Sequence, residues 1–286
     1  MKVFKWMGTL AVAVSLLTSC LGESDNRFTR QGFAVAGVSE KSYKTVLYTS
    51  YGPMYSANLM SQVVDGACYT VQYEVDLNAP ENKTQTMDYY TATITVFDEV
   101  SKGNTVFYNV PDTTTMMAEE QVVTNVAGFT GEVGGYLNGY LFLNATLNEL
   151  KEQKNNFTLY WDRSKEAEEN SEGIPTYTLF LRVVKIADGT GSAATSTNEI
   201  RAYRLKEVID AVNKTEAEKG SDRFNLRINY IKEASEEGKP SWDKYDYQFA
   251  VYKESYTKKR VGDHPLFCYH PKSASLLTRG MTQFLI

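Results

Sequence analysis

The sequence predicts a mostly β protein, in which a small OB-like barrel is followed by a β-sandwich with one covering helix. Residues Ala67 to Leu77 alternate apolar and polar side chains without interruption, which is typical of a strand with one buried face. The chain also holds 20 tyrosines, and aromatic residues favour strands. A convincing helical apolar period begins at one place, Leu205.

The first element, residues 1–19, is predicted to be a lipoprotein signal peptide. Lys2 and Lys5 precede the apolar run Gly8 to Leu17, which is too short to cross the roughly 30 Å hydrocarbon core as a helix. Leu17-Thr18-Ser19-Cys20 ends this run. This segment resembles the lipobox of bacterial lipoproteins, in which the cysteine thiol receives a diacylglycerol. The alternative is an ordinary secretory signal with an incidental cysteine.

We therefore expect Cys20 to become the acylated first residue of the mature protein, with residues 20–32 as a tether. Acyl chains stabilise membrane binding by about 0.8 kcal/mol per buried methylene, and two or more chains make the anchoring durable. The acidic stretch Leu21 to Asn26 resembles the surface-export signal of Bacteroidetes lipoproteins. The expected location is the cell envelope, as an outer-membrane lipoprotein, and this stretch adds the expectation of surface exposure.

Residues 33–125 are predicted to form the barrel domain. The alternating strand that ends at Leu77 is followed by a loop, Asn78 to Asn82, and the Tyr51-Gly52-Pro53 stretch is read as a break. A helical turn is expected at Met116 to Gln121. The remaining strands of this domain are expected at Phe33–Val38, Ser42–Thr49, Tyr89–Phe97 and Thr105–Val110.

Residues 126–257 are predicted to form the sandwich. The glycine-rich stretch Gly128 to Gly139 precedes the apolar run Tyr140 to Leu143. It is read as a turn that opens a strand, because a dinucleotide-binding loop would need a helix after it. A helix is expected from Leu205, with Gly220 as its stop. Further strands are expected at Phe157–Trp161, Tyr177–Ile186, Phe224–Tyr230 and Tyr245–Tyr252, and a charged loop at Arg163–Gly173.

Residues 258–286 show no strand alternation and are interpreted as a mobile tail or as an artefact of the reading frame. This tail carries both histidines, His264 and His270, and one cysteine, Cys268. Export to an oxidising space permits a disulfide between Cys268 and Cys68. The alternative is a buried, unpaired Cys68 and a free Cys268.

The charge balance excludes some partners. Removal of the signal peptide leaves 28 basic and 35 acidic residues, a net charge of −7. Nucleic acid binding needs a basic stripe, so we expect no nucleic acid partner. We also expect no cofactor, because no motif for one is present.

Catalytic motifs are equally sparse. Nucleophilic catalysis of the Ser-His or Cys-His kind needs a histidine base, and both histidines lie in the tail. A zinc site made of His264, Cys268 and His270 would lack ligands from the ordered chain, so no metal site is predicted. We therefore expect a protein that is not an enzyme.

Paired carboxylates are the remaining catalytic alternative. Four aspartates lie near expected strand ends, but the sequence cannot place two of them at the separation that glycoside hydrolysis requires. They are Asp76, Asp98, Asp162 and Asp188. The acidic loop Glu166 to Glu172 is interpreted as a solvated face.

Aromatic residues beside carboxylates are the candidate binding residues. Trp161 precedes Asp162, and Trp242, Tyr245 and Tyr247 lie close together in the sequence. Exposed rings in such positions could stack on sugars, whereas the alternative is ordinary packing in the core or on an edge strand.

Several stretches together resemble the NigD-like lipoproteins of Bacteroidetes. The resemblance covers roughly Phe33 to Lys253 and rests on the lipobox together with packing motifs. These motifs are Gly135-Tyr136-Leu137-Asn138, Phe157 to Asp162, Tyr177 to Leu181, Tyr203-Arg204 and Leu226 to Tyr230. The resemblance implies an OB-type N-terminal domain and a C-terminal sandwich, and it supplies no catalytic residues.

The first functional hypothesis is a membrane-anchored lipoprotein of the cell envelope that binds a glycan, peptide or protein partner without catalysis. One alternative is an envelope glycoside hydrolase or other hydrolase with paired carboxylates. A second alternative is a structural or assembly component with an exposed sheet edge.

Overall fold

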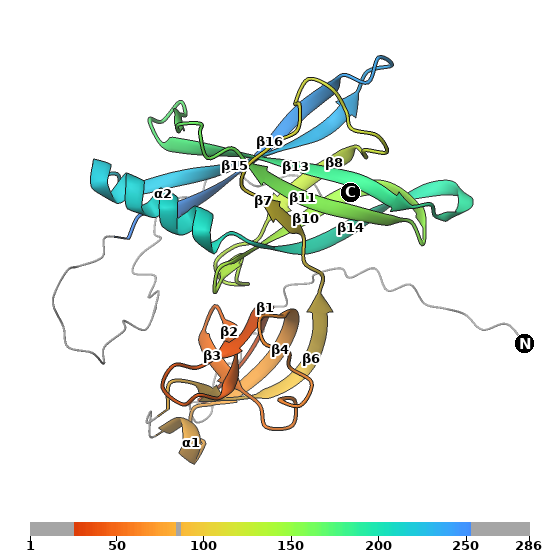
Figure 1. The fold of residues 1–286 in the computed structure, drawn as a ribbon. Coiled ribbons are helices and arrows are strands. Elements are labelled where there is room, and N and C mark those ends of the chain that lie inside the picture. Colours follow the sequence, from red (N-terminus) through yellow and green to blue (C-terminus); the bar gives the residue numbers. More distant parts are fainter. Residues whose placement is uncertain (1–25, 84–86, 253–286) are drawn as a thin grey trace, which may run out of the picture.

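The structure, a computed structural model, describes residues 26–83 and 87–252 of the 286-residue chain. A barrel and a sandwich are stacked one on the other (Figure 1), and the expected mostly β class is confirmed. The elements are β1 Arg27–Val38, β2 Thr45–Thr49, β3 Gly52–Tyr55, β4 Cys68–Asp76, α1 Pro80–Lys83, β5 Tyr90–Thr91, β6 Thr93–Val100, β7 Asn104–Val106, β8 Val123–Gly128, β9 Tyr136–Leu137, β10 Tyr140–Lys151, β11 Lys154–Trp161, β12 Glu168–Glu169, β13 Pro175–Ala187, β14 Thr190–Arg204, α2 Lys206–Lys219, β15 Arg223–Ala234 and β16 Pro240–Ala250.

The barrel closes because one bent strand pairs at both edges of the sheet. The pairing order is β5-β3-β2-β1-β4-β6, and β5 and β6 are separated only by Ala92. The β5 part pairs in parallel with β3, and the β6 part pairs antiparallel with β4. The long strand β1 pairs with β4 over its first part and with β2 near its end, as closure of a small barrel requires.

The barrel core is filled by one face of each strand. Ala34 and Ala36 of β1 point inward, together with Tyr69, Val71 and Tyr73 of β4. Phe33 and Val35, on the opposite face of β1, are also buried but belong to a different cluster. The strand β1 is therefore covered on both faces, and its second face packs on the other domain.

The sandwich consists of a small sheet and a large sheet. The small sheet has the order β14-β10-β8, with β9 beside β10. The large sheet has the order β16-β15-β13-β11-β7, with β12 beside β13. Leu141, Leu143 and Leu147 of β10 pack in one core with Leu179 and Leu181 of β13.

The helix α2 covers this core with the apolar face that the sequence predicts. Val208, Ile209 and Val212 are buried in the sandwich core. The helix ends at Gly220, whose φ of 84° is a left-handed conformation that glycine adopts without a steric penalty. The expected stop at Gly220 is confirmed.

The segment between β7 and β8 is held against the outer face of the large sheet by a buried ion pair. Arg182 of β13 and Glu120 of this segment both have fully buried side chains and form a salt bridge. The Arg182 guanidinium also donates to the carbonyl oxygens of Asp112 (3.1 Å) and Thr115 (3.3 Å). Trp242 lies over this guanidinium and donates from Nε1 to the carbonyl oxygen of Thr113.

Strand pairing corrects the expected domain limits. Residues 27–32, expected in the tether, are already part of β1 and pair with β4. The barrel ends with β6 at Val100, because β7 pairs in parallel with β11 of the sandwich. The strand expected at Thr105 to Val110 therefore belongs to the second domain and not to the barrel, and residues 107–125 also follow the barrel. The expected tail at 258–286 lies outside the described residues.

Several elements differ from the sequence expectation. The segment Met116 to Gln121 is a non-helical turn followed by a single β-bridge at Glu120, and not a helical turn. The sequence break at Gly52 and Pro53 is the short strand β3, which lies next to β5. The strand β14 was missed because most of its first nine residues are exposed, so the pattern shows no apolar alternation there.

Candidate functional site

The two domains meet through an apolar junction. Phe33 of β1 stacks on Phe142 of β10, with ring centroids 4.2 Å apart, and meets the edge of Phe129 at 4.7 Å. Val35 and Ala202 lie in the same buried cluster. Packing of this kind has two matched surfaces and little free volume, so it fixes the orientation of the domains.

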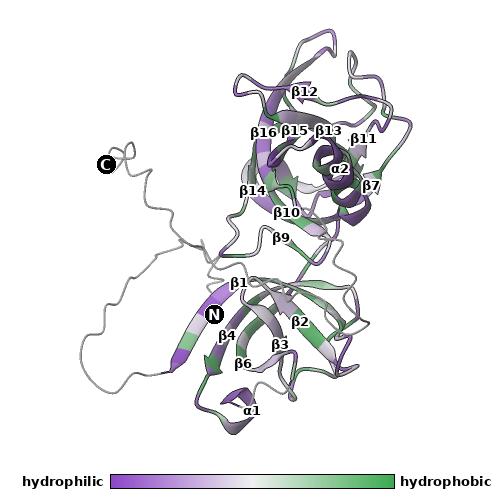
Figure 2. Ribbon diagram, turned by 90° about the vertical axis from the view of Figure 1, so that its left-hand side faces the viewer, coloured by the Kyte–Doolittle hydropathy of each residue, from purple (hydrophilic) through white to green (hydrophobic). Residues whose placement is uncertain are grey.

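Backbone contacts reinforce this junction. The Phe33 amide donates to the carbonyl oxygen of Val133 at 2.8 Å, and the Ser50 hydroxyl donates to that of Glu132 at 2.6 Å. A Cβ atom on Gly32 would lie 2.7 Å from the Val133 oxygen, so glycine permits this close approach. Figure 2 shows the short strand β9 between the two domains, beside the end of β1.

A cavity of about 340 Å³ opens beside the junction, and we call it the interdomain cleft. This volume lies at the lower end of the range for small-molecule sites, roughly 300–1,000 Å³. The packed junction joins the two walls of this cleft. Its lining residues are Val35, Ala36, Gly37, Val38, Glu40, Tyr48, Asp65 and Gly66 from the barrel, and Asn138, Tyr140, Arg204 and Lys206 from the sandwich.

The sandwich wall is set by a tight hairpin and by the start of α2. Asn138 and Gly139 connect β9 to β10 with φ values of 43° and 86°, as a two-residue type I′ turn requires. The turn carries the Asn138 side chain to the barrel, where a Cβ atom on Gly37 would lie 3.3 Å from its Nδ2. Arg204 ends β14 and Lys206 begins α2, so both cations stand on rigid elements.

The barrel wall is acidic. Glu40 follows β1, and Asp65 lies in the turn before β4. Both side chains are exposed. The Tyr48 hydroxyl donates to the carbonyl oxygen of Val38 at 3.1 Å. Burial raises the pKa of Tyr48, and the negative charges of Asp88, Glu40 and Asp65 raise it further.

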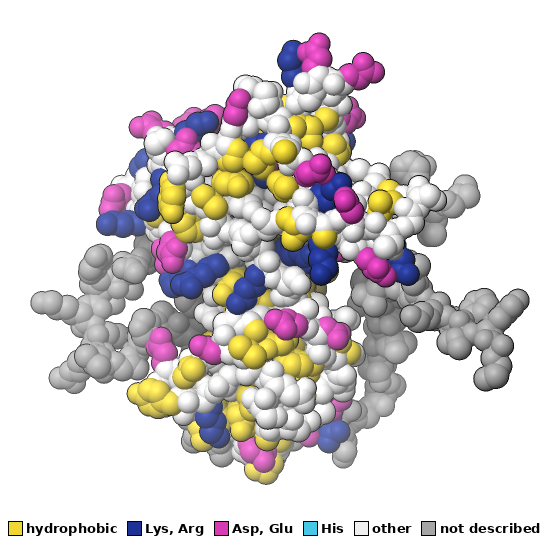
Figure 3. Space-filling view, turned by 45° about the vertical axis from the view of Figure 1, so that its right-hand side comes forward, with side chains coloured by type: hydrophobic (Ala, Val, Ile, Leu, Met, Phe, Trp, Pro, Cys, Tyr) yellow, Lys and Arg dark blue, Asp and Glu magenta, His cyan; other side chains and the backbone are white. Residues whose placement is uncertain are grey.

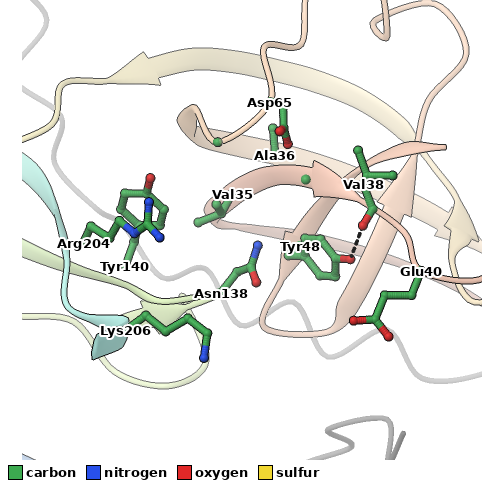
Figure 4. A pocket seen from close by; sticks show the side chains of 12 residues that line it. Val35, Ala36, Val38, Glu40, Tyr48, Asp65, Asn138, Tyr140, Arg204 and Lys206 are labelled. Atoms are coloured by element: carbon green, nitrogen blue, oxygen red, sulfur yellow. Dashed lines mark hydrogen bonds between the residues drawn. The ribbon is translucent and has the colours of Figure 1, made fainter. Parts of the chain in front are cut away.

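Charges of opposite sign therefore face each other across the cleft. Figure 4 shows Lys206 and Glu40 on opposite walls, with Asn138 and the Tyr48 ring between them, and Arg204 beside Tyr140. Figure 3 shows Lys and Arg side chains gathered on the sandwich side of the junction and acidic side chains below them on the barrel side.

The two cations have only exposed partners. Arg204 lies 3.6 Å from Glu207, and these side chains are 63% and 64% exposed. Lys206 pairs with Asp210 one helical turn later, and these are 59% and 47% exposed. Exposed pairs of this kind contribute at most about 1 kcal/mol, so a ligand anion can replace them.

The four aromatic candidates do not form one solvent-facing groove. Trp161 is 7% exposed and lies in the sandwich core. Trp242 lies on the outer face of the large sheet, where its ring meets Phe180 edge-on at 5.3 Å. The two tryptophans thus lie on opposite faces of the large sheet.

Tyr245 and Tyr247 are brought together on the inner side of β16. Both pack against the sandwich core, and the Tyr247 hydroxyl donates to the carbonyl oxygen of Phe129 at 3.3 Å. Burial raises the pKa of Tyr247 to about 12. Packing contacts of this kind are the alternative that the sequence left open for these rings.

The four aspartates lie in separate places with local partners. Asp76 pairs with Arg27 at 3.0 Å, and Asp98 is exposed on β6. Asp162 accepts two hydrogen bonds from Ser164, which lower its pKa. Asp188 pairs with Lys185, and this contact lowers the pKa of its carboxyl group.

The other candidate residues give no metal site within the described chain. Among residues 26–83 and 87–252, no group of three His, Cys, Asp or Glu side chains is placed to hold a metal ion. Cys68 is buried in the junction, and burial raises the pKa of its thiol to about 12. Cys20, His264, Cys268 and His270 lie outside the described residues.

The sequence contains two local signals for the walls of the cleft, one in each domain. The run Phe33 to Val38 is apolar at successive positions and does not alternate, which indicates a strand buried on both faces. The Asn138-Gly139 pair is a hairpin signal. Neither signal indicates that this hairpin packs against the end of the strand that is buried on both faces.

Comparison with known proteins identifies the first domain. Residues 24–98 match the family model described as the lipoprotein OB domain. A search of curated proteins finds no match. No helix among the described residues has the length and apolar character needed to span a membrane.

Solved structures share the fold of most of the chain. An uncharacterized protein from Parabacteroides merdae ATCC 43184 matches with a TM-score of 0.68 at 19% identity, covering 78% of this chain and 100% of that chain. A candidate lipoprotein from Bacteroides fragilis NCTC 9343 matches with a TM-score of 0.50 at 11% identity, covering 79% and 99%. A NigD-like immunity protein from Bacteroides caccae ATCC 43185 matches with a TM-score of 0.42 at 14% identity, covering 76% and 96%.

The expected resemblance to Bacteroidetes lipoproteins with an OB-type N-terminal domain is confirmed. The matches to the Parabacteroides merdae and Bacteroides fragilis structures, both below 25% identity, establish the shared fold. The lipoprotein OB domain indicates a location in the cell envelope. None of these three relatives is described as an enzyme.

Proposed function

We propose that this protein is an outer-membrane lipoprotein, anchored through acylated Cys20, that binds a ligand in the interdomain cleft without catalysis. The cleft itself carries the proposal. It is a cavity of about 340 Å³ between two domains that share an apolar junction, and polar side chains of both domains line it. The match of residues 24–98 to a lipoprotein domain supports the anchor.

The hydrolase alternative receives less support from the same cleft. Glu40 and Asp65 are the two carboxylates that line it, and both are exposed. The general acid of a glycosidase is normally shielded from water, since burial keeps it protonated at neutral pH. We therefore assign these carboxylates to ligand binding.

The anchor is tested by substitution of the cysteine. In cells that process lipoproteins, we expect the native chain in the membrane fraction, with a lipid mass on its N-terminal peptide. Cys20→Ala should leave an unlipidated and unprocessed chain in the soluble fraction. Cys68→Ala is the matched control and should fractionate as the native chain does. Recovery of Cys20→Ala in membranes would refute the anchor.

Ligand binding is tested by hydrogen exchange and mass spectrometry of the purified full chain. Glycan, peptide and small-molecule fractions of the cell envelope are added separately. Protection of the segments 35–40 and 136–140 by any fraction is the expected result, because these segments form the cleft walls. Protection confined to segments outside the cleft would refute this site.

A further inference from the structure

The two walls of the interdomain cleft differ in the sign of their charge. Glu40 and Asp65 stand on the barrel wall, and Arg204 and Lys206 stand on the sandwich wall. A ligand that carries one charge only would gain attraction at one wall and repulsion at the other. A ligand with both charges can satisfy both walls.

The middle of the cleft is uncharged but offers polar contacts. The Asn138 amide can donate and accept hydrogen bonds, and the Tyr48 ring offers a flat apolar surface beside it (Figure 4). A peptide group has one N–H donor and one C=O acceptor, so it can pair with both the oxygen and the NH₂ group of this amide. The cleft therefore suits a ligand with amide groups between its charged ends.

The volume limits the length of such a ligand. About 340 Å³ is small for a binding site, and an extended peptide spans at most about 3.5 Å per residue. We infer that the interdomain cleft binds a short unblocked peptide, with its terminal carboxylate at Lys206 and its terminal ammonium at Glu40. This inference rests on the proposed function, because it names the ligand class of the same cleft.

The wall cations are available for this role. Their partners Glu207 and Asp210 are about half exposed or more, so these pairs contribute little and can be exchanged for a ligand carboxylate. The opposite wall needs no exchange, since neither Glu40 nor Asp65 forms an ion pair with another described residue. Binding should therefore weaken as salt is raised.

The test uses diglycine, triglycine and tetraglycine as probes of the full chain, with equilibrium binding measured by ligand-observed NMR. Triglycine should bind at least about threefold more tightly than N-acetyl-triglycine or triglycinamide, because each of these lacks one terminal charge. Equal binding of the three compounds would overturn the inference, as would a lack of binding by all peptides.

Charge reversal gives a second test that does not depend on the absolute affinity. Glu40→Lys and Lys206→Glu should each weaken triglycine binding by about threefold or more. The double variant restores two opposite walls, so a peptide can bind in the reverse direction and the affinity should recover. Both side chains are exposed, so folding should be unaffected. Lys41→Glu, in the same loop but outside the cleft lining, is the control.

The outcome separates this inference from the proposed function. If a glycan fraction protects the cleft walls in hydrogen exchange while no glycine peptide binds, the peptide inference is wrong and cleft binding stands. If peptides bind but the charge-reversal variants bind them as well as the native chain, the assignment of the peptide termini to these walls is wrong.

Discussion

Removal of Glu120 should destabilise the sandwich strongly. Its carboxylate accepts from Nε and Nη2 of Arg182, with 2.6 Å between Nη2 and Oε2, and both side chains have no exposed surface. Glu120→Ala leaves the guanidinium buried with only the carbonyl oxygens of Asp112 and Thr115 as hydrogen-bond acceptors. The variant therefore keeps a buried positive charge without its counter-ion.

The expected loss follows from this burial. Breaking a buried ion pair by removing one partner typically costs about 3–5 kcal/mol, whereas an exposed pair is worth at most about 1 kcal/mol. The free energy of unfolding of Glu120→Ala should thus fall by about 3–5 kcal/mol. The double variant Glu120→Leu, Arg182→Met should recover most of this loss, since it removes the charge as well as its partner.

Urea unfolding followed by tryptophan fluorescence measures this loss in one domain. Trp161 and Trp242 both lie in the sandwich, and the third tryptophan, Trp6, belongs to the predicted signal peptide. Glu237→Ala is the matched control, because its pair with Lys239 is 74% and 70% exposed. A loss below about 1 kcal/mol for Glu120→Ala, or a loss equal to that of the control, would refute the reasoning.

Three further predictions concern the junction and the helix. Phe33→Ala should lower the free energy of unfolding in urea by about 3–5 kcal/mol, because it empties the space beside Phe142; a loss below 1 kcal/mol would show that this ring is not tightly packed. Burial alone would raise the pKa of Glu216, but hydrogen bonds, led by that from Ser221, outweigh it and lower the pKa. The resulting stabilisation is fully present above the unfolded pKa of about 4.3 and is lost as the pH falls through the lower folded pKa. The difference in stability between the native protein and Glu216→Gln should therefore shrink between pH 5 and pH 2 in thermal melts. A difference that stays constant over this range would contradict the prediction. Gly220→Ala should cost about 1 kcal/mol in the same melts, because its φ of 84° strains any residue with a Cβ; an unchanged melting temperature would argue against a left-handed cap.

Some elements were predictable because their evidence is local. The strand ending near Leu77 and the helix after Leu205 each bury one face, so the period of apolar residues reports the element directly. The stop at Gly220 needs only its own backbone conformation. The same reasoning missed most of β14, which pairs along β10 with largely exposed side chains.

The candidate binding residues show the limit of this approach. Proximity in sequence grouped Trp242 with Tyr245 and Tyr247, but an odd spacing along a strand places residues on opposite faces. Trp242 accordingly lies with Arg182 outside the large sheet, while the two tyrosines pack toward the core. Aromatic composition alone does not state which face of a sheet is covered.

The sequence by itself determined the mostly β class, the order of barrel and sandwich, and the covering helix, because each of these depends on the pattern within short stretches of chain. Only the tertiary structure decided that β7 belongs to the sandwich and that Phe33 stacks on Phe142. The tertiary structure also decided that Glu40 and Lys206 face each other across one cleft. The physical reason is that local periodicity shows that a face is buried, while the identity of the surface that buries it depends on the packing of segments far apart in the chain.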